Sequence, residues 1–181
     1  LPKDVSTILH LAGQSSGEIS FDNPVSDLKK NTISTLNLIN YALKNNVSRL
    51  IYASSMSVYG STPEGPVGED FHCKPLSCYG ASKLASENYL SVYKKYLPST
   101  VLRMINVYGP GQDLSNMRQG MVSIFVSQAL KTGNIQVKGS LNRFRDFVYI
   151  DDVVNTCLKV LKYNKKNPTK KIKLLGRVCS Q

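Results

Sequence analysis

Residues 49–60 read RLIYASSMSVYG, a stretch in which apolar residues give way to small polar ones. Arg49 to Ser54 predicts a buried strand, because a short apolar run bounded by turn residues is typical of a strand covered on both faces. A loop rich in glycine and proline follows this strand. The segments on either side decide which kind of sheet the strand belongs to.

Strands and helices are expected to alternate on both sides of this stretch. Upstream, Val5 to Leu11 predicts another buried strand, and Pro24 to Asn46 predicts a helix because its apolar residues recur at helical spacing. Downstream, the expected elements are a helix over Ser77–Tyr96, a strand over Thr100–Asn106, a helix over Gln119–Lys131, short strands over Ile135–Lys138 and Phe147–Ile150, and a helix capped by Asp151 or Asp152 that runs to about Tyr163. This alternation predicts an α/β fold, a parallel sheet with helices on both faces.

Composition and length bound the class of protein. The 181 residues suit one domain, and 41% hydrophobic with 19% charged residues predicts a soluble globular protein. No apolar run is long enough to span a bilayer, and no signal peptide is visible, although Leu1 is not a natural initiator. The four cysteines lack a Cys-x-x-Cys pair and form no zinc set with the two histidines, so we expect no metal and reduced thiols in the cytoplasm.

The net charge of +11 does not predict a nucleic-acid-binding protein, because the excess is local. From Lys159 to the C-terminus there are eight basic residues and no acidic one. We interpret the Lys-rich segment Lys162 to Lys173 as a solvated helix end and turn rather than a phosphate-binding patch.

Three predicted strands end in residues that suit a binding site. They end in Leu11-Ala12-Gly13-Gln14, Ala53-Ser54-Ser55 and Ile105-Asn106-Val107. Ligands bind at the carboxyl ends of parallel strands, so these ends are expected to share one cleft. The alternative is that Gly13 only permits a turn and the serines only cap backbone groups.

Tyr79 and Lys83 lie four residues apart on a predicted helix that starts beside this cleft, and so share a helix face. A nearby ammonium favours a phenolate, and such a tyrosine is a general base or acid for a substrate hydroxyl, with Ser55 close by. With ten tyrosines in the chain, about one Tyr-x-x-x-Lys spacing is expected by chance. The alternative interpretation is an ordinary amphipathic helix with a packed Tyr79 and a solvated Lys83.

Six motifs occur in an order that resembles a known family. They are His10-Leu11-Ala12-Gly13, Asn31 with Thr35, Tyr52-Ala53-Ser54-Ser55 with Val58-Tyr59-Gly60, Tyr79-Gly80-Ala81-Ser82-Lys83, Arg103 through Gly109-Pro110-Gly111, and Arg145-Asp146-Phe147 with Asp151-Asp152-Val153. Together they resemble the extended short-chain dehydrogenases/reductases, closest to the nucleotide-sugar epimerases and dehydratases and especially UDP-sugar 4-epimerases. The resemblance implies a Rossmann-like doubly wound sheet.

The resemblance also implies an NAD-dependent hydride mechanism on a nucleotide sugar. Tyr79 would take the proton of a sugar hydroxyl, Lys83 would lower the tyrosine pKa and hold the nicotinamide ribose, and Ser55 would hydrogen-bond the reacting oxygen. The implied cofactor-binding residues are Leu11, Ala12, Gly13, Gln14, Asn31 (or the adjacent Lys30), Ala53, Ser54, Tyr79 and Lys83. The implied substrate-binding residues are Asn106 and Arg145 for the diphosphate, and Gln136 to Lys138 along the nucleobase. A surface charge paired with Asp146 is the alternative for Arg145.

Met56 and Ser57 narrow the implied reaction. Dehydratases and decarboxylases of this family carry an acidic residue just before the Val-Tyr-Gly sequence, and neither Met56 nor Ser57 is a carboxylic acid. We therefore expect an epimerase. A reductase or dehydrogenase of the same family, or a non-catalytic remnant, stays open as an alternative.

The glycine-rich turn with which relatives begin is absent near the start of the chain, and so is the acidic residue that follows it. The sequence thus resembles an internal fragment that opens on the family's fourth strand. We expect residues 1–110 to form part of an NAD-binding domain, and residues 111–181 to form part of a nucleotide-sugar-binding region interleaved with the last Rossmann elements. Relatives commonly pair through two long helices, which implies a homodimer.

Overall fold

The structure, a computed structural model, describes all residues except 1, 3, 64, 142–144, 163–169 and 174–181. Its helices are α1 (Ile19–Asp22), α2 (Pro24–Leu28), the π-helical turn η1 (Lys29–Ile33), α3 (Ser34–Lys44), the 3₁₀ turn η2 (Met56–Val58), α4 (Cys78–Val92), α5 (Met121–Thr132) and α6 (Ile150–Lys162). Its strands are β1 (Thr7–His10), β2 (Arg49–Ser55), β3 (Ser99–Met104), β4 (Asn106–Tyr108), β5 (Phe147–Tyr149) and β6 (Lys170–Lys173).

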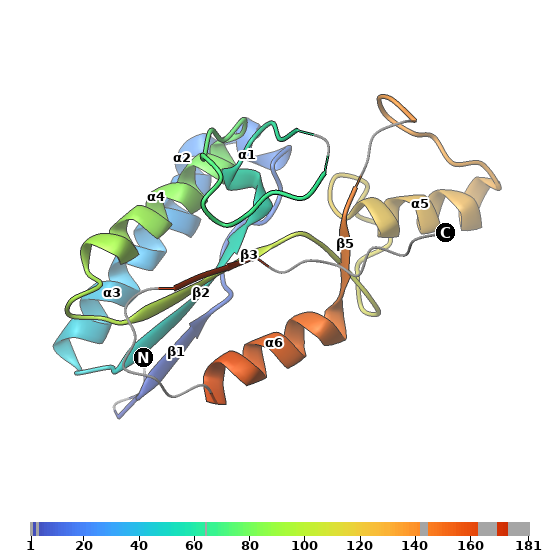
Figure 1. Ribbon diagram of the computed structural model, residues 1–181. Helices are drawn as coiled ribbons and strands as arrows, with labels where there is room; N and C mark the ends of the chain where they lie inside the picture. The colour runs from blue at the N-terminus through green and yellow to red at the C-terminus, as the bar shows by residue number, and fades with distance from the viewer. Residues whose placement is uncertain (1, 3, 64, 142–144, 163–169, 174–181) are drawn as a thin grey trace.

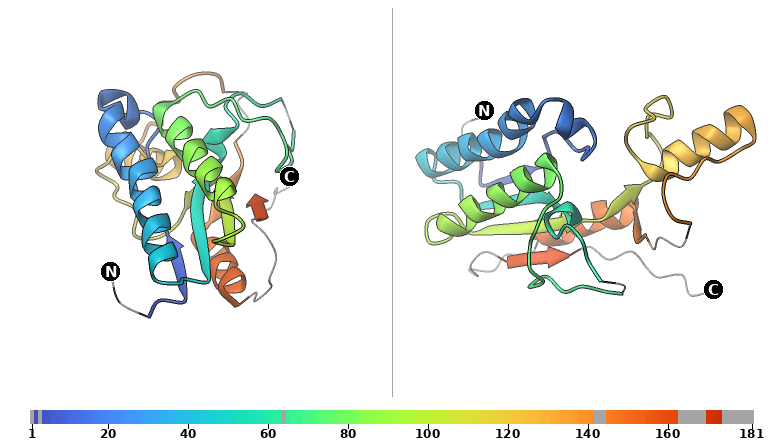
Figure 2. Two further views of the ribbon diagram at one scale, coloured as in Figure 1. Left: turned by 90° about the vertical axis from the view of Figure 1, so that its left-hand side faces the viewer. Right: turned by 90° about the horizontal axis from the view of Figure 1, so that it is seen from above.

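Four of these strands form one sheet in the order β1-β2-β3-β6, and every neighbouring pair is parallel. Helices α3 and α4 lie on one side of this sheet and α6 lies on the other (Figure 1), a separation that Figure 2 shows from two further sides. Strands β4 and β5 form a second, two-stranded parallel sheet. The predicted α/β architecture with a parallel sheet is confirmed.

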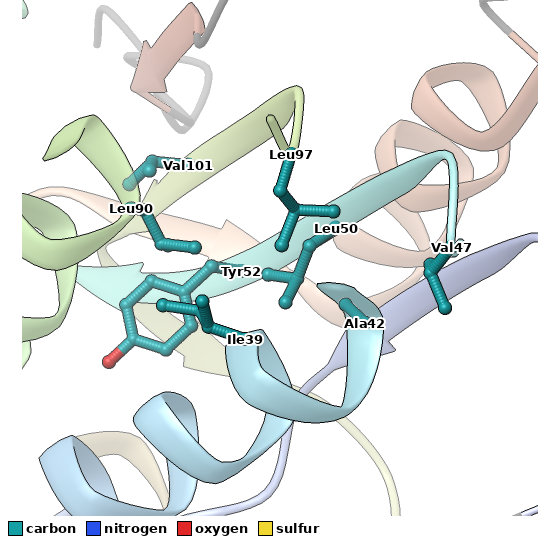
Figure 3. Close-up of a cluster of buried hydrophobic side chains, with 8 residues drawn as sticks. All are labelled: Ile39, Ala42, Val47, Leu50, Tyr52, Leu90, Leu97 and Val101. Atoms are coloured by element: carbon teal, nitrogen blue, oxygen red, sulfur yellow. The ribbon is translucent and has the colours of Figure 1, made fainter. Parts of the chain in front are cut away.

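Strand β2 divides the core between two faces because successive side chains of a strand point to opposite sides. Leu50 and Tyr52 join the cluster under α3 and α4, which also holds Ile39, Ala42, Val47, Leu90, Leu97 and Val101 (Figure 3). Ile51 joins the opposite cluster, in which Val153, Cys157 and Val160 of α6 take part. A strand buried on both faces explains the unbroken apolar run in the sequence.

The helix expected over Pro24–Asn46 runs from α2 through η1 to α3 and ends at Lys44. The Asn23 side chain caps its start by accepting a 2.8 Å hydrogen bond from the backbone N–H of Ser26. The π-helical turn in its middle was not expected, and it carries the buried Asn31. π-turns inside α-helices occur frequently at functional sites.

Three expectations about local structure were wrong. Ile135–Lys138 is not a strand: none of the described strands pairs with it, its side chains are exposed, and the backbone N–H of Gln136 donates to Gln128 Oε1 of α5 at 2.9 Å. Within the Lys-rich segment, Lys170–Lys173 is a strand paired with β3 rather than a solvated turn. Asp151 and Asp152 lie inside the first turn of α6 instead of capping it. The helix over Ser77–Tyr96 is also shorter than expected, since α4 ends at Val92.

Within the part of the chain that is described, no helix has both the length and the apolar character to cross a membrane.

Candidate active site

A cavity of about 600 Å³ lies at the carboxyl edge of the four-stranded sheet. The chain beyond β1 contributes Leu11, the end of β2 contributes Ala53–Ser55, and the chain beyond β3 contributes Ile105–Val107. Parallel neighbours in the sheet end at the same edge, which is why the three strand ends meet. The structure thus brings residues of all three strand ends to one cavity, and that this cavity is a binding site stays a prediction.

Lys83 enters this cavity from α4 with only 4% of its surface exposed. Its Nζ donates a 2.9 Å hydrogen bond to the carbonyl oxygen of Ala53 and lies 4.9 Å from the ring centre of Tyr52. Burial lowers the pKa of Lys83 to about 8, and the negative charge of Asp27 partly opposes that shift. The ammonium is therefore fixed over the end of β2, and it loses its proton at a lower pH than an ordinary lysine does.

Tyr79 lies one turn before Lys83, and its ring centre is 5.8 Å from Lys83 Nζ. Burial raises the pKa of Tyr79, a hydrogen bond with Ser55 lowers it, and the charge of Asp27 raises it. Lys83 was expected to lower this pKa, but in the structure the largest effect is the burial of the phenol, which raises it. Tyr79 is thus a neutral phenol beside the Ser55 hydroxyl.

Ser55 and α4 are brought together by two local features. Ser55 ends β2, and its Oγ accepts a 3.2 Å hydrogen bond from the backbone N–H of Ser57 and lies 3.2 Å from Ser57 Oγ. Gly80 lets the start of α4 approach this turn, because a Cβ added at Gly80 would lie 2.5 Å from the carbonyl oxygen of Ser57. The Ser77 hydroxyl caps α4 by accepting from Gly80 N–H at 3.0 Å.

The loop beyond β1 approaches Asn31 of the π-helical turn. Gly13 has φ of +149°, and a Cβ there would lie 2.4 Å from Asn31 Oδ1. Asn31 is 1% exposed, and its Oδ1 has no hydrogen-bond partner among the described residues. Buried acceptors are rarely left unpaired, so this oxygen is suited to a donor from a bound molecule. Of the predicted cofactor-binding residues, only Ala12, Gly13, Gln14 and Asn31 do not line the cavity.

The predicted substrate-binding residues divide into two groups. Asn106 and Arg145 line the cavity, and Asn106 Nδ2 donates to the Asp146 carbonyl oxygen at 2.7 Å. Gln136 and Lys138 are exposed and do not line it. Their expected contact with a nucleobase stays a prediction.

Sequence reasoning missed a buried ion pair behind the site. Arg103 Nη2 lies 2.6 Å from Glu87 Oε2, and both side chains are almost fully buried. Glu87 Oε1 also accepts a 2.5 Å hydrogen bond from Ser54 Oγ, and Arg103 Nη1 donates to the Glu69 carbonyl oxygen at 2.8 Å. Glu87 follows Lys83 by four residues, a helical spacing that signalled a shared face but not the strand partner.

Contacts of two further cavity residues, Arg118 and Gln119, were also not predicted. Arg118 lines the cavity, and its guanidinium bonds two acidic residues near α1, with Nε 3.1 Å from Glu18 Oε1 and Nη1 2.7 Å from Asp22 Oδ2. Gln119 Nε2 donates to Ser15 Oγ at 2.6 Å. These contacts join the loop beyond β1 to the segment before α5, and the sequence carries no pattern that pairs them.

A parallel sheet with a buried tyrosine and lysine at its carboxyl edge defines a Rossmann-like protein of the short-chain dehydrogenase/reductase type. Residues 2–176 match the model of the NAD dependent epimerase/dehydratase family. A putative UDP-glucose 4-epimerase of Methanocaldococcus jannaschii is 36% identical over 164 residues, which are 89% of this chain and 53% of the relative. The chain therefore belongs to the NAD dependent epimerase/dehydratase family.

Two further comparisons indicate the range of this family. UDP-glucuronic acid decarboxylase 1 of Xenopus tropicalis is 34% identical over 172 residues, 91% of this chain and 40% of that protein. The structure of UDP-glucose 4-epimerase from Thermus thermophilus in complex with NAD matches with a TM-score of 0.82 and 33% identity, covering 94% of this chain and 56% of that one. The chain spans about half the length of the curated relatives it matches, and the family is NAD-dependent.

Proposed function

We propose that the chain is the acid/base-bearing part of an NAD-dependent epimerase that acts on a nucleotide sugar, by 4-epimerisation of a UDP-sugar. The observation that carries this proposal is the buried Tyr79 phenol beside Ser55, in a cavity that also holds the Lys83 ammonium. A positioned phenol of this kind exchanges a proton with a sugar hydroxyl or keto oxygen. Family membership and the 4-epimerases among its relatives support the choice of substrate class.

The residues present fit the nicotinamide half of NAD. Lys83 and Tyr79 would hold it from α4, and Ala53 and Ser54 from the end of β2. Leu11 to Gln14 would hold it from the loop beyond β1, and Asn31 from the π-helical turn. The unpaired Asn31 Oδ1 and the close approach at Gly13 are the features that favour a ligand there. When bound, NAD supplies a hydride acceptor that returns the hydride to the keto-sugar.

The chain's own residues would manage the proton and the oxygen. Tyr79 would exchange the proton, and Ser55, within its hydrogen-bonding reach, would hold the reacting oxygen. As a neutral phenol, Tyr79 is set to donate a proton, so its action as a base requires a nearby positive charge, which Lys83 would provide. The partial burial of the site limits exchange of that proton with water.

Met56 and Ser57 favour epimerisation over elimination. Both line the cavity next to Ser55, and neither side chain is a carboxylic acid. Elimination of water needs a second acid to protonate the leaving hydroxyl. Epimerisation needs only the proton exchange at one oxygen and a keto-sugar that rotates within the site. A reductase or dehydrogenase that uses the same tyrosine stays the alternative.

The remaining parts of the proposal concern the substrate and the assembly. Asn106 and Arg145 would bind the diphosphate, for which the planar fork of an arginine is well suited. Residues 1–110 would form part of the NAD-binding domain and residues 111–181 part of the sugar-binding region. A homodimer in the cytoplasm completes the proposal.

The test is to incubate the complete protein and NAD with UDP-glucose, UDP-N-acetylglucosamine and their uronates, and to separate the products by chromatography. We expect one of them to convert to its 4-epimer, and Tyr79→Phe to lower the rate by a factor of about 100 or more. Tyr89→Phe is the matched control, since Tyr89 lies on the same helix with 42% of its surface exposed. The epimerase proposal fails if no nucleotide sugar is converted, and the role of Tyr79 fails if Tyr79→Phe retains activity.

A further inference from the structure

Asp27 is a buried carboxylate that the proposed mechanism does not use. It lies on α2 with 1% of its surface exposed. Its Oδ1 accepts a 3.1 Å hydrogen bond from Asn31 Nδ2, and its Oδ2 accepts a hydrogen bond from Ser82 Oγ of α4. One carboxylate therefore connects the π-helical turn to the helix that carries Tyr79 and Lys83.

The contact with Asn31 determines how that amide is oriented. A carboxylate only accepts hydrogen bonds, so the NH₂ group of Asn31 has to face Asp27, and its oxygen has to face the other way. That oxygen is the atom that lies unpaired next to Gly13. Asp27 thus fixes Asn31 as an acceptor directed at the loop beyond β1.

The contact with Ser82 determines where α4 lies. Ser82 is the neighbour of Lys83, and its Oγ lies 3.1 Å from the carbonyl oxygen of Tyr79. Thr32 of the π-helical turn adds a second link, since its Oγ1 donates to the Ser82 carbonyl oxygen at 3.0 Å. The turn of α4 that bears the two proposed active-site residues is therefore anchored to the helix that bears Asp27.

We propose that Asp27 is a positioning residue, which holds the Asn31 carbonyl oxygen toward the bound cofactor and anchors, through Ser82, the helical turn that carries Tyr79 and Lys83. The role toward a cofactor rests on the proposed function, whereas the contacts of Asp27 with Asn31 and Ser82 do not depend on it. The titratable groups near the carboxylate are Lys83 and Tyr79 on α4, with His10 of β1 beyond Lys83. In agreement with this placement, the Asp27 charge raises the pKa of both Lys83 and Tyr79.

The test is Asp27→Leu in the complete protein, a change that keeps a side chain of similar size and removes both its charge and its acceptor oxygens. Three results are expected: the Asn31 side-chain NH₂ resonances lose their protection from hydrogen exchange, an NMR titration places the pKa of Lys83 lower than in the wild type, and NAD binds about tenfold more weakly by calorimetry. Asp151→Asn, an exposed position in the first turn of α6, removes the same charge and is expected to change none of these.

Two more variants keep the inference falsifiable. Asp27→Asn with Asn31→Asp again places a donor opposite an acceptor and is expected to keep most of the NAD affinity that Asp27→Leu loses. If Asp27→Leu does not fold, Ser82→Ala decides, because it removes the hydroxyl through which Asp27 reaches α4 and leaves the contact between Asp27 and Asn31 in place. Ser82→Ala should lower kcat several-fold while the Asn31 NH₂ stays protected. A folded Asp27→Leu protein with unchanged NAD affinity and Lys83 pKa overturns the assignment, as does a Ser82→Ala protein with unchanged kcat. The resonance, titration and binding measurements need no turnover, so they are independent of whether any sugar nucleotide is converted.

Discussion

The ammonium of Lys83 is bound to the backbone of β2, through a 2.9 Å hydrogen bond from its Nζ to the carbonyl oxygen of Ala53. This contact fixes the charge at the end of the strand, and the Tyr79 ring centre lies 5.8 Å away. The lysine is thus held by the sheet and not by the tyrosine. Its position depends on how closely α4 approaches β2.

Lys83→Met is expected to remove most of the activity and the alkaline limb of the pH profile. Since the pKa of Lys83 is lowered to about 8, its positive charge is present below that pH and is lost as the pH rises through it. In the wild type, turnover should therefore fall above about pH 8, which rate measurements between pH 6 and 10 will show. Lys94→Met, at an exposed lysine, serves as the control. A wild-type rate that stays level to pH 10 would contradict this role.

Gly80→Ala is expected to push the start of α4 away from the end of β2. The new Cβ would lie 2.5 Å from the backbone oxygen of Ser57, which cannot move independently of Ser55. Overpacking of this kind costs about 1–3 kcal/mol of unfolding free energy, and a shift of Tyr79 by about 1 Å lowers the rate about 100-fold. Urea unfolding and rate measurements test both effects. Gly68→Ala, where a Cβ would meet nothing within 4 Å, should change neither.

Glu87→Gln is expected to destabilise the fold by about 3–5 kcal/mol, because it leaves the buried Arg103 guanidinium without its counter-charge. The exposed pair of Arg118 and Glu18 provides the comparison, and Glu18→Gln should cost less than about 1 kcal/mol. The double variant Glu87→Leu with Arg103→Met should lose less stability than Glu87→Gln, because it removes both charges. Chemical denaturation measures all three variants, and equal losses for Glu87→Gln and Glu18→Gln would refute this ranking.

His10 is expected to make the fold sensitive to acid. Burial, together with the charge of Lys83, lowers the pKa of His10 to about 4 in the folded state. Between pH 6.5 and about 4 the unfolded chain then binds more protons than the folded one. The free energy of unfolding therefore decreases as the pH is lowered through this window, by about 3 kcal/mol in total. His10→Gln should flatten that slope in denaturation curves at several pH values. His72→Gln, at the exposed second histidine, should leave it unchanged.

The strands that meet at the site could be predicted because they are buried on both faces and so appear as apolar runs, as for β2. The short strand β6 could not, because three of its four residues are lysines, a residue type that is depleted in strands. Conversely, Ile135 and Val137 suit a strand by composition, but no strand in the described part of the chain pairs with them. The hydrogen-bond and ion-pair partners of the site residues were harder to predict than the strands.

Those partners are far apart in the sequence. Ser82 is 55 residues from Asp27. Similarly, Arg103 is 16 residues from Glu87 and belongs to a different element. A helical spacing such as that between Asp27 and Asn31 indicates a common face, but which element covers this face is decided by the packing of α2 against α4.

The π-helical turn η1 has a consequence for the genetic tolerance of this helix. A π-turn holds one extra residue by turning less per residue than the about 100° of an α-helix, so the helical segments on its two sides keep their faces. Asp27 on α2 therefore faces Ser82 while Ile39 and Ala42 on α3 face the core. Deleting one residue within α2 or α3 would rotate one of these faces away by about 100°, whereas deleting one within Lys29–Ile33 would restore a regular helix with both faces in place. A one-residue deletion is therefore expected to be better tolerated inside this turn than on either side of it.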